Sequence, residues 1–64
     1  MKLKTDLFEW MLNRTNNGEK TTRRDIDITF HEVLSNELSS ILADLMEDGL
    51  IDLKNYEYRA VVRG

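Results

Sequence analysis

The residue types that carry catalysis or bind metals are scarce in this chain. His31 is the one histidine and there is no cysteine among the 64 residues, so a zinc site would need carboxylates for every other ligand. No metal-ligand spacing, phosphate-binding glycine loop or dinucleotide fingerprint occurs. A serine nucleophile would need His31 and a carboxylate in a pocket that excludes water, which a core this small scarcely provides. The sequence predicts a protein that is not an enzyme and uses no metal or cofactor.

The charged residues are the remaining candidates for binding, and they are segregated along the chain. Residues 1–24 hold six basic and three acidic side chains, residues 25–52 hold eight acidic side chains and no Lys or Arg, and residues 53–64 hold three basic and one acidic. Cationic ends suit a nucleic acid, because affinity for a duplex rests largely on Lys and Arg that neutralise phosphates. The acidic middle suits a basic protein surface, and it is equally typical of a solvated face.

The length of 64 residues suffices for one domain and is too short for two cores. A core of this size leaves a small net stability, for which self-association is a common remedy, so a homodimer is a candidate state. No stretch approaches the ~20 apolar residues of a membrane span. The sequence predicts one domain over residues 1–64, no membrane partner and a cytoplasmic location.

A first helix is expected from about Thr5 to Thr15. Thr5 can cap its first turn, and the two asparagines and the glycine of residues 16–18 tolerate the left-handed backbone that ends a helix. Trp10 lies at the edge of the apolar stripe, where packing in the core is its expected role and a contact between two copies is the alternative. The residues that form this stripe are Leu3, Leu7, Phe8 and Met11.

Residues 22–31 fit two different structures. Thr22 and Asp25 have the spacing of a capping box, with Asp in place of the usual Glu, which indicates the start of a helix. The stretch 25–29 alternates and is rich in β-branched residues, as in a half-buried strand. A short helix from about Arg23 to His31 is the favoured interpretation, and the strand stays open as the alternative.

The strongest periodic signal runs from Val33 to Met46, where apolar residues at three-and-four spacing predict a long amphipathic helix. Ser35 or Asn36 can cap its start. The apolar stripe also continues upstream, so one unbroken helix from Thr29 to Asp48 is an open alternative. Gly49 ends the helix in either case, because glycine accepts a positive φ.

The apolar period then changes to two, which predicts a C-terminal β-hairpin. A turn at Lys54-Asn55 would set Leu53 opposite Tyr56. The same register sets Ile51 opposite Tyr58, so large apolar side chains would pair on the side that faces the helices.

The charged residues of the hairpin argue against this register in one respect. Asp52 would lie beside Glu57, a like-charge pair, and lysine is a poor residue for a tight hairpin turn, so a longer loop is the alternative. The side chains expected to face outward are Asp52, Glu57, Arg59 and Arg63.

The order of three helices and a hairpin resembles a winged helix-turn-helix over residues 22–62, of the compact kind found in phage and plasmid regulators. Residues 42–51 look like the end of the family's recognition helix running through glycine into the first wing strand. Residues 24–26 look like the start of its second helix, and residues 35–40 like the turn into the third. The resemblance implies an α+β fold: a three-helix winged helix-turn-helix with a C-terminal two-stranded β-hairpin wing.

The resemblance also implies which residues bind double-stranded DNA. In that family the start of the third helix enters the major groove, and the second helix and the wing contact the backbone. The implied groove contacts are Asn36, Glu37, Ser39 and Ser40. The implied phosphate contacts are Arg23, Arg24, Lys54, Asn55 and Arg59. The expected function is that of a non-catalytic DNA-binding transcriptional regulator.

The alternative function is that of a protein-interaction adaptor with the same fold. The acidic third helix would then dock on a basic protein surface. The residues that would form this contact are Asp44, Glu47, Asp48 and Trp10.

Overall fold

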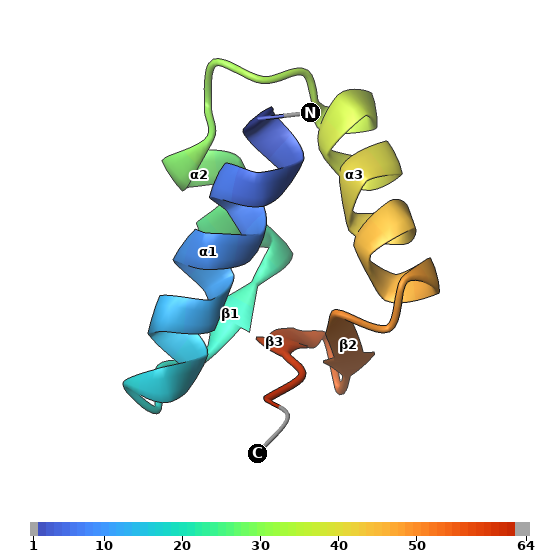
Figure 1. The fold of residues 1–64 in the computed structure, drawn as a ribbon. Coiled ribbons are helices and arrows are strands. Elements are labelled where there is room, and N and C mark those ends of the chain that lie inside the picture. Colours follow the sequence, from blue (N-terminus) through green and yellow to red (C-terminus); the bar gives the residue numbers. More distant parts are fainter. Residues whose placement is uncertain (1, 63–64) are drawn as a thin grey trace.

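The computed structural model describes residues 2–62, which form three helices and a three-stranded antiparallel sheet (Figure 1). Helices α1 and α3 lie on opposite sides of the molecule, and the sheet lies at one end of them. The chain is therefore α+β, as the sequence predicts. The elements in chain order are α1 (Lys2–Asn16), β1 (Thr21–Thr22), α2 (Arg23–Thr29), α3 (Ser35–Glu47), β2 (Ile51–Lys54) and β3 (Glu57–Ala60).

The hydrophobic core is built mainly from α1 and α3. α3 supplies half of the eight clustered buried side chains, which explains why its apolar period is the clearest in the sequence. Burial of one such aliphatic side chain contributes about 1.5–3 kcal/mol. The buried cluster consists of Leu7, Met11, Ile26, Leu38, Ile41, Leu42, Leu45 and Ile51.

Helix α1 is longer than expected at its start. It begins at Lys2, so Thr5 lies within the helix and the prediction that it caps the helix is wrong. The extra turn brings Leu3 against the core, which favours the longer helix. Gly18 has φ 74° just after the helix ends at Asn16, in agreement with the predicted stop.

Strand β1 was not predicted, because two residues are too short to show an alternating pattern. Thr21 pairs with Tyr58 and Thr22 pairs with Glu57, so β1 extends the hairpin on its β3 side. The resulting strand order is β1-β3-β2.

The side chain of Arg14 connects α1 to this short strand. Its Nε donates a hydrogen bond to Thr21 Oγ1 at 2.9 Å, and its Nη2 donates to the carbonyl of Lys20 at 2.6 Å. Thr21 is fully buried, so this bond satisfies a hydroxyl that water cannot reach. The guanidinium carbon also lies 5.3 Å from the centroid of the Trp10 ring, within the range of a cation–π contact.

Helix α2 begins at the predicted capping box. Asp25 N donates to Thr22 Oγ1 at 3.3 Å, and Thr22 N donates to the Asp25 carboxylate at 2.9 Å. The helix interpretation of this stretch is confirmed and the strand alternative is wrong. The helix ends at Thr29, two residues before the predicted His31, because Phe30 leaves helical geometry at φ −107° and ψ 45°.

Helix α3 is separate from α2, so the alternative of one unbroken helix from Thr29 to Asp48 is wrong. The residue that precedes α3 is Leu34, which makes no side-chain cap, and Ser35 and Asn36 are the first helical residues instead of caps. Gly49, at φ 74°, follows the helix end as predicted.

The hairpin turn is displaced by one residue from the predicted turn. The central residues are Asn55 and Tyr56, with φ values of 53° and 65°, which is the pattern of a type I′ turn. Leu53 therefore pairs with Tyr58, and Ile51 pairs with Ala60. The predicted pairings of Tyr56 with Leu53 and of Tyr58 with Ile51 are wrong, and Tyr56 is exposed instead of facing the helices.

The observed register of the hairpin places residues of opposite charge across from one another. Asp52 pairs with Arg59 and Lys54 pairs with Glu57, so opposite charges lie across both positions. The predicted register would have placed Asp52 beside Glu57, and like charges in that position are destabilising. The predicted alternation of inward and outward faces is confirmed only in part. Ile51, Tyr58 and Ala60 are buried or half-buried, whereas Leu53 and Tyr56 are exposed and Glu57 is half-buried. The predicted outward position of Arg63 lies outside the described residues.

Because Arg14 donates several hydrogen bonds from one planar group, we expect its replacement by lysine to lower the stability of the fold. Arg14→Lys keeps the charge and removes the forked set of donors, so we expect the free energy of unfolding to fall by about 1–2 kcal/mol. Urea denaturation followed by circular dichroism measures this change. The matched control is Arg24→Lys at an exposed position, which should change the value by less than about 0.5 kcal/mol. Equal stability of the two variants would contradict the role given to Arg14.

The capping box predicts a pH dependence of stability. Hydrogen bonds from the Thr22 backbone and hydroxyl hold the pKa of Asp25 below its ordinary value of 3.8. The carboxylate therefore stabilises the fold above that value, and the contribution is lost as the pH falls through 3.8 toward the lower pKa of the folded state.

We expect Asp25→Asn to flatten the fall in urea midpoint between about pH 6 and pH 3. Asp6→Asn should leave this fall unchanged, because Asp6 is exposed and forms no hydrogen bond with the described residues. A wild-type slope in the Asp25→Asn variant would show that the capping box does not contribute.

Candidate functional site

The first two turns of α3 present polar side chains to solvent. Leu38, Ile41 and Leu42 point into the core, so the residues between them are turned outward. The four predicted groove contacts lie on this outward surface and are all exposed, namely Asn36, Glu37, Ser39 and Ser40.

Arg23 ties the start of α2 to the start of α3. Its guanidinium donates four hydrogen bonds: to Asp27 Oδ1 at 3.0 Å, to Ser39 Oγ at 2.9 Å, and to the carbonyl and hydroxyl oxygens of Ser35 at 2.7 and 3.1 Å. The predicted phosphate contact by Arg23 stays a prediction. What the geometry gives this side chain is a positioning role, because it fixes how α3 projects from α2.

Arg24 has a different environment from its neighbour. Its side chain is exposed and makes no hydrogen bond or ion pair with any residue from 2 to 62. Of the two adjacent arginines, Arg24 is therefore the one whose charge is available to an outside anion.

The hairpin turn adjoins the start of α2 through the sheet. Thr22, the last residue of β1, pairs with Glu57, the first residue of β3, and Arg23 follows Thr22 directly. Arg23 in turn donates hydrogen bonds to Ser35 and Ser39, so the start of α2 is linked to the start of α3 by Arg23 and to the hairpin by Thr22. We call this set of segments, residues 22–24, 35–40 and 54–57, the polar band.

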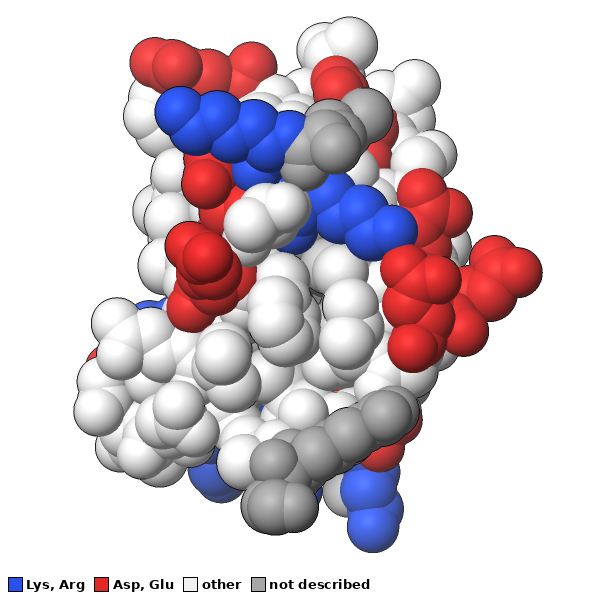
Figure 2. Space-filling view, in the orientation of Figure 1, with Lys and Arg blue, Asp and Glu red and all other residues white. Residues whose placement is uncertain are grey.

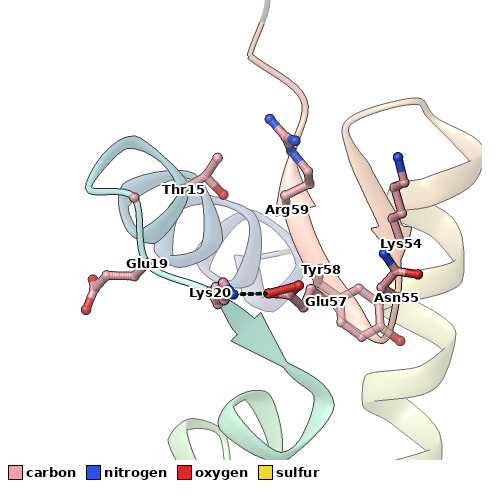
Figure 3. A pocket seen from close by; sticks show the side chains of 9 residues that line it. Thr15, Glu19, Lys20, Lys54, Asn55, Glu57, Tyr58 and Arg59 are labelled. Carbon is pink, nitrogen blue, oxygen red and sulfur yellow. Dashed lines mark ion pairs between the residues drawn. The ribbon is translucent and has the colours of Figure 1, made fainter.

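A surface cavity of about 300 Å³ lies beside the band, between the hairpin and the loop that leads into β1. Lys20 and Glu57 form an ion pair at 3.9 Å across it (Figure 3). Lys54 and Arg59 extend to the same side from adjacent strands. Neither of these two cations forms an ion pair or hydrogen bond with the described residues, although Arg59 lies opposite Asp52. Asn55, the third predicted wing contact, also lines this cavity.

The acidic residues of the docking hypothesis lie at the other end of α3. Figure 2 shows acidic side chains gathered over this end of the helix. Lys4 Nζ of α1 lies 2.8 Å from Asp48 Oδ2, so the two side chains form an ion pair that is also a hydrogen bond. This hydrogen bond raises the pKa of Lys4. Asp44 and Glu47 are exposed and form no ion pair with the described residues, although the charge of Lys4 attracts both carboxylates.

Trp10 packs against the core and is half-buried. Its ring meets the Phe30 ring edge-on, with centroids 5.4 Å apart and an interplanar angle of 88°. The expected core role is confirmed, and the contact between copies stays a prediction. His31 is exposed in the connection between α2 and α3, and within residues 2–62 no three His, Asp or Glu side chains are placed to hold a metal ion.

The residues that position the band were not identified from the sequence. From the sequence, Arg14 was counted only as a charge and Arg23 was assigned to phosphate, not to a contact between α2 and α3. Thr15, whose Oγ1 atom accepts a hydrogen bond from Ala60 N at 3.0 Å, was predicted only as a helix end. Their partners are distant in the chain, so no local pattern could reveal them. Among the described helices, none is both long and apolar enough to cross a bilayer.

Comparison of the chain with protein-family models, with curated proteins and with solved structures finds no match. The function is therefore argued from the geometry of the polar band alone.

The two adjacent arginines are expected to differ in their effect on stability. Arg23→Ala removes four hydrogen bonds and leaves Ser35 and Ser39 without this partner, so the free energy of unfolding should fall by about 1–3 kcal/mol. Arg24→Ala should change it by less than about 0.5 kcal/mol. Thermal and urea unfolding measure both. A neutral Arg23→Ala variant would mean that the contact between α2 and α3 is dispensable.

Proposed function

We propose that this protein is a non-catalytic DNA-binding transcriptional regulator of the winged helix-turn-helix type. The observation that carries the proposal is the polar band, in which the start of α3, the start of α2 and the hairpin turn are joined by Arg23 and by the pairing of Thr22 with Glu57. In this binding mode the start of one helix enters the major groove and two flanking segments contact the DNA backbone. The three segments of the band would take these three roles.

The order of the elements supports this type of fold. α2 and α3 are separate helices joined by residues 30–34, and the hairpin follows α3 after a glycine.

The acidic end of α3 is compatible with DNA binding because of its distance from the band. Asp44 lies eight residues after Asn36, which corresponds to about 12 Å along a helix. This exceeds the Debye length of about 8 Å at physiological ionic strength, so the repulsion between these acids and DNA is largely screened. Glu37 lies within the band, where a carboxylate can accept a hydrogen bond from the amino group of cytosine.

The available cations of the band supply the attraction to phosphate. Arg24 and Lys54 are exposed and form no ion pair with the described residues, and Arg59 adds a third charge from β3. Each phosphate that such a side chain neutralises contributes about 0.9 to the slope of log affinity against log salt.

The experiment that tests the proposal is fluorescence anisotropy of a labelled random duplex of about 20 base pairs, at about 50 and 200 mM salt. We expect binding at low salt that weakens at the higher concentration. The double variant Arg24→Ala/Lys54→Ala should bind more weakly at low salt, and its salt slope should be smaller by about 2.

The matched control for this experiment removes charges of the opposite sign. Asp44→Asn/Glu47→Gln should leave affinity unchanged or raise it, because these acids only repel DNA. If the wild-type protein gives no anisotropy change at the lower salt concentration, the proposal is overturned. Size-exclusion chromatography of the same samples reports whether the protein binds as a homodimer.

A second candidate function is docking on a basic protein partner. The observation that favours it is that α3 carries no Lys or Arg, while Asp44 and Glu47 are exposed and unpaired among the described residues and Met46 beside them is 37% exposed. An adaptor of this kind would lose partner binding in Asp44→Asn/Glu47→Gln and keep it in Arg24→Ala/Lys54→Ala, the reverse of the result expected for DNA.

A further inference from the structure

Tyr56 occupies the least favourable backbone position for a large side chain in the described chain. It is the second central residue of the hairpin turn, with φ 65°, in the left-handed region. A bulky residue is a genuine outlier there, and a type I′ turn strongly prefers glycine after asparagine at this position. Asn55 fits the first central position well, so the departure from the preferred pair lies in Tyr56 alone.

The fold draws no visible benefit from this tyrosine. Its side chain is 90% exposed, and its hydroxyl forms no hydrogen bond with the described residues. Ile51, Tyr58 and Ala60 supply the inward face of the hairpin, so the ring of Tyr56 is not needed for packing. A strained residue without a structural role is a reason to look for a functional one.

The surroundings of Tyr56 indicate the kind of partner. Lys54 and Arg59 lie on one face of the same hairpin, at diagonal positions across the two strands. They lie opposite Glu57 and Asp52, but neither forms an ion pair or hydrogen bond within the described chain. An exposed aromatic ring at the turn of a hairpin that carries these two cations matches a sugar–phosphate backbone, which presents the apolar face of a sugar between anionic phosphates. A basic protein surface would instead be repelled by these cations.

We infer that Tyr56 is a DNA-contacting residue whose ring packs on a deoxyribose of the backbone, while Lys54 and Arg59 hold the flanking phosphates. This inference rests on the proposed function and adds to it a residue that the resemblance did not assign. A tyrosine brings a large contact area and has few rotatable bonds to immobilise, so it is well suited to an anchor at the tip of a turn.

The decisive variant is Tyr56→Gly, because stability and binding should move in opposite directions. Glycine relieves the left-handed strain and completes the preferred Asn-Gly turn, so the urea midpoint should be equal to or higher than that of the wild-type protein. Removal of the ring should weaken duplex binding by about fivefold or more, by analogy with the loss of a base-stacking aromatic. The salt slope should stay unchanged, because no cation is removed.

Two further measurements separate a ring contact from other effects. Tyr56→Phe keeps the ring and should retain binding within about twofold, since the proposed contact uses the ring face and not the hydroxyl. In Tyr58→Phe, Tyr56 is the sole tyrosine, and its ring resonances should shift when the same duplex is added, as followed by nuclear magnetic resonance.

The outcomes distinguish this inference from the function on which it rests. If the wild-type protein binds the duplex and Arg24→Ala/Lys54→Ala weakens binding, but Tyr56→Gly binds like wild type, the role of Tyr56 is refuted and the DNA-binding function stands. If the wild-type protein does not bind the duplex at low salt, both are refuted. A loss of stability in Tyr56→Gly would also overturn the inference, because the tyrosine would then serve the fold.

Discussion

The arrangement of the helices and the sheet in this small protein depends on the hydrogen bonds that the guanidinium group of Arg14 donates. Strand β1 has only two residues, and a pair of backbone contacts cannot hold so short a segment at the edge of a sheet. Arg14 supplies the missing restraint through its bonds to Thr21 and to the Lys20 carbonyl, while Thr15 from the same helix end accepts a hydrogen bond from Ala60 in β3. The last turn of α1 thus fixes both the edge strand and the strand beside it.

The position of the polar band follows from this restraint. Once β1 is held, Thr22 is placed both to pair with Glu57 and to cap α2, so one residue links the sheet to the helix. Arg23 then continues the connection into α3 by its bonds to Ser35 and Ser39. These contacts therefore align three segments, of which only the start of α3 contributes a side chain, Leu38, to the buried cluster.

The cations of the protein differ in whether they contact other residues of the chain. Arg14, Arg23 and Lys4 are engaged in contacts within the chain, with exposed side-chain fractions between 25 and 32%. Arg24 and Lys54 are exposed and unpaired among the described residues. The net charge of −3 therefore says little about the surface that a partner would meet, because Asp44 and Glu47 lie in the second half of α3 and Glu37 is the one acidic residue of that helix within the band.

The sequence by itself determined the class of the fold and most of its elements. The period of α3, the capping box at Thr22, the stop at Gly49 and the existence of the hairpin are local signals, and local signals can be recognised without the rest of the chain. The tertiary structure alone decided the strand β1, the turn at Asn55-Tyr56 and the difference between the two arginines at the start of α2. These features depend on partners outside the segment itself: a two-residue strand exists only where β3 accepts it, and the hairpin register depends on which cross-strand residues pair and on burial of one face.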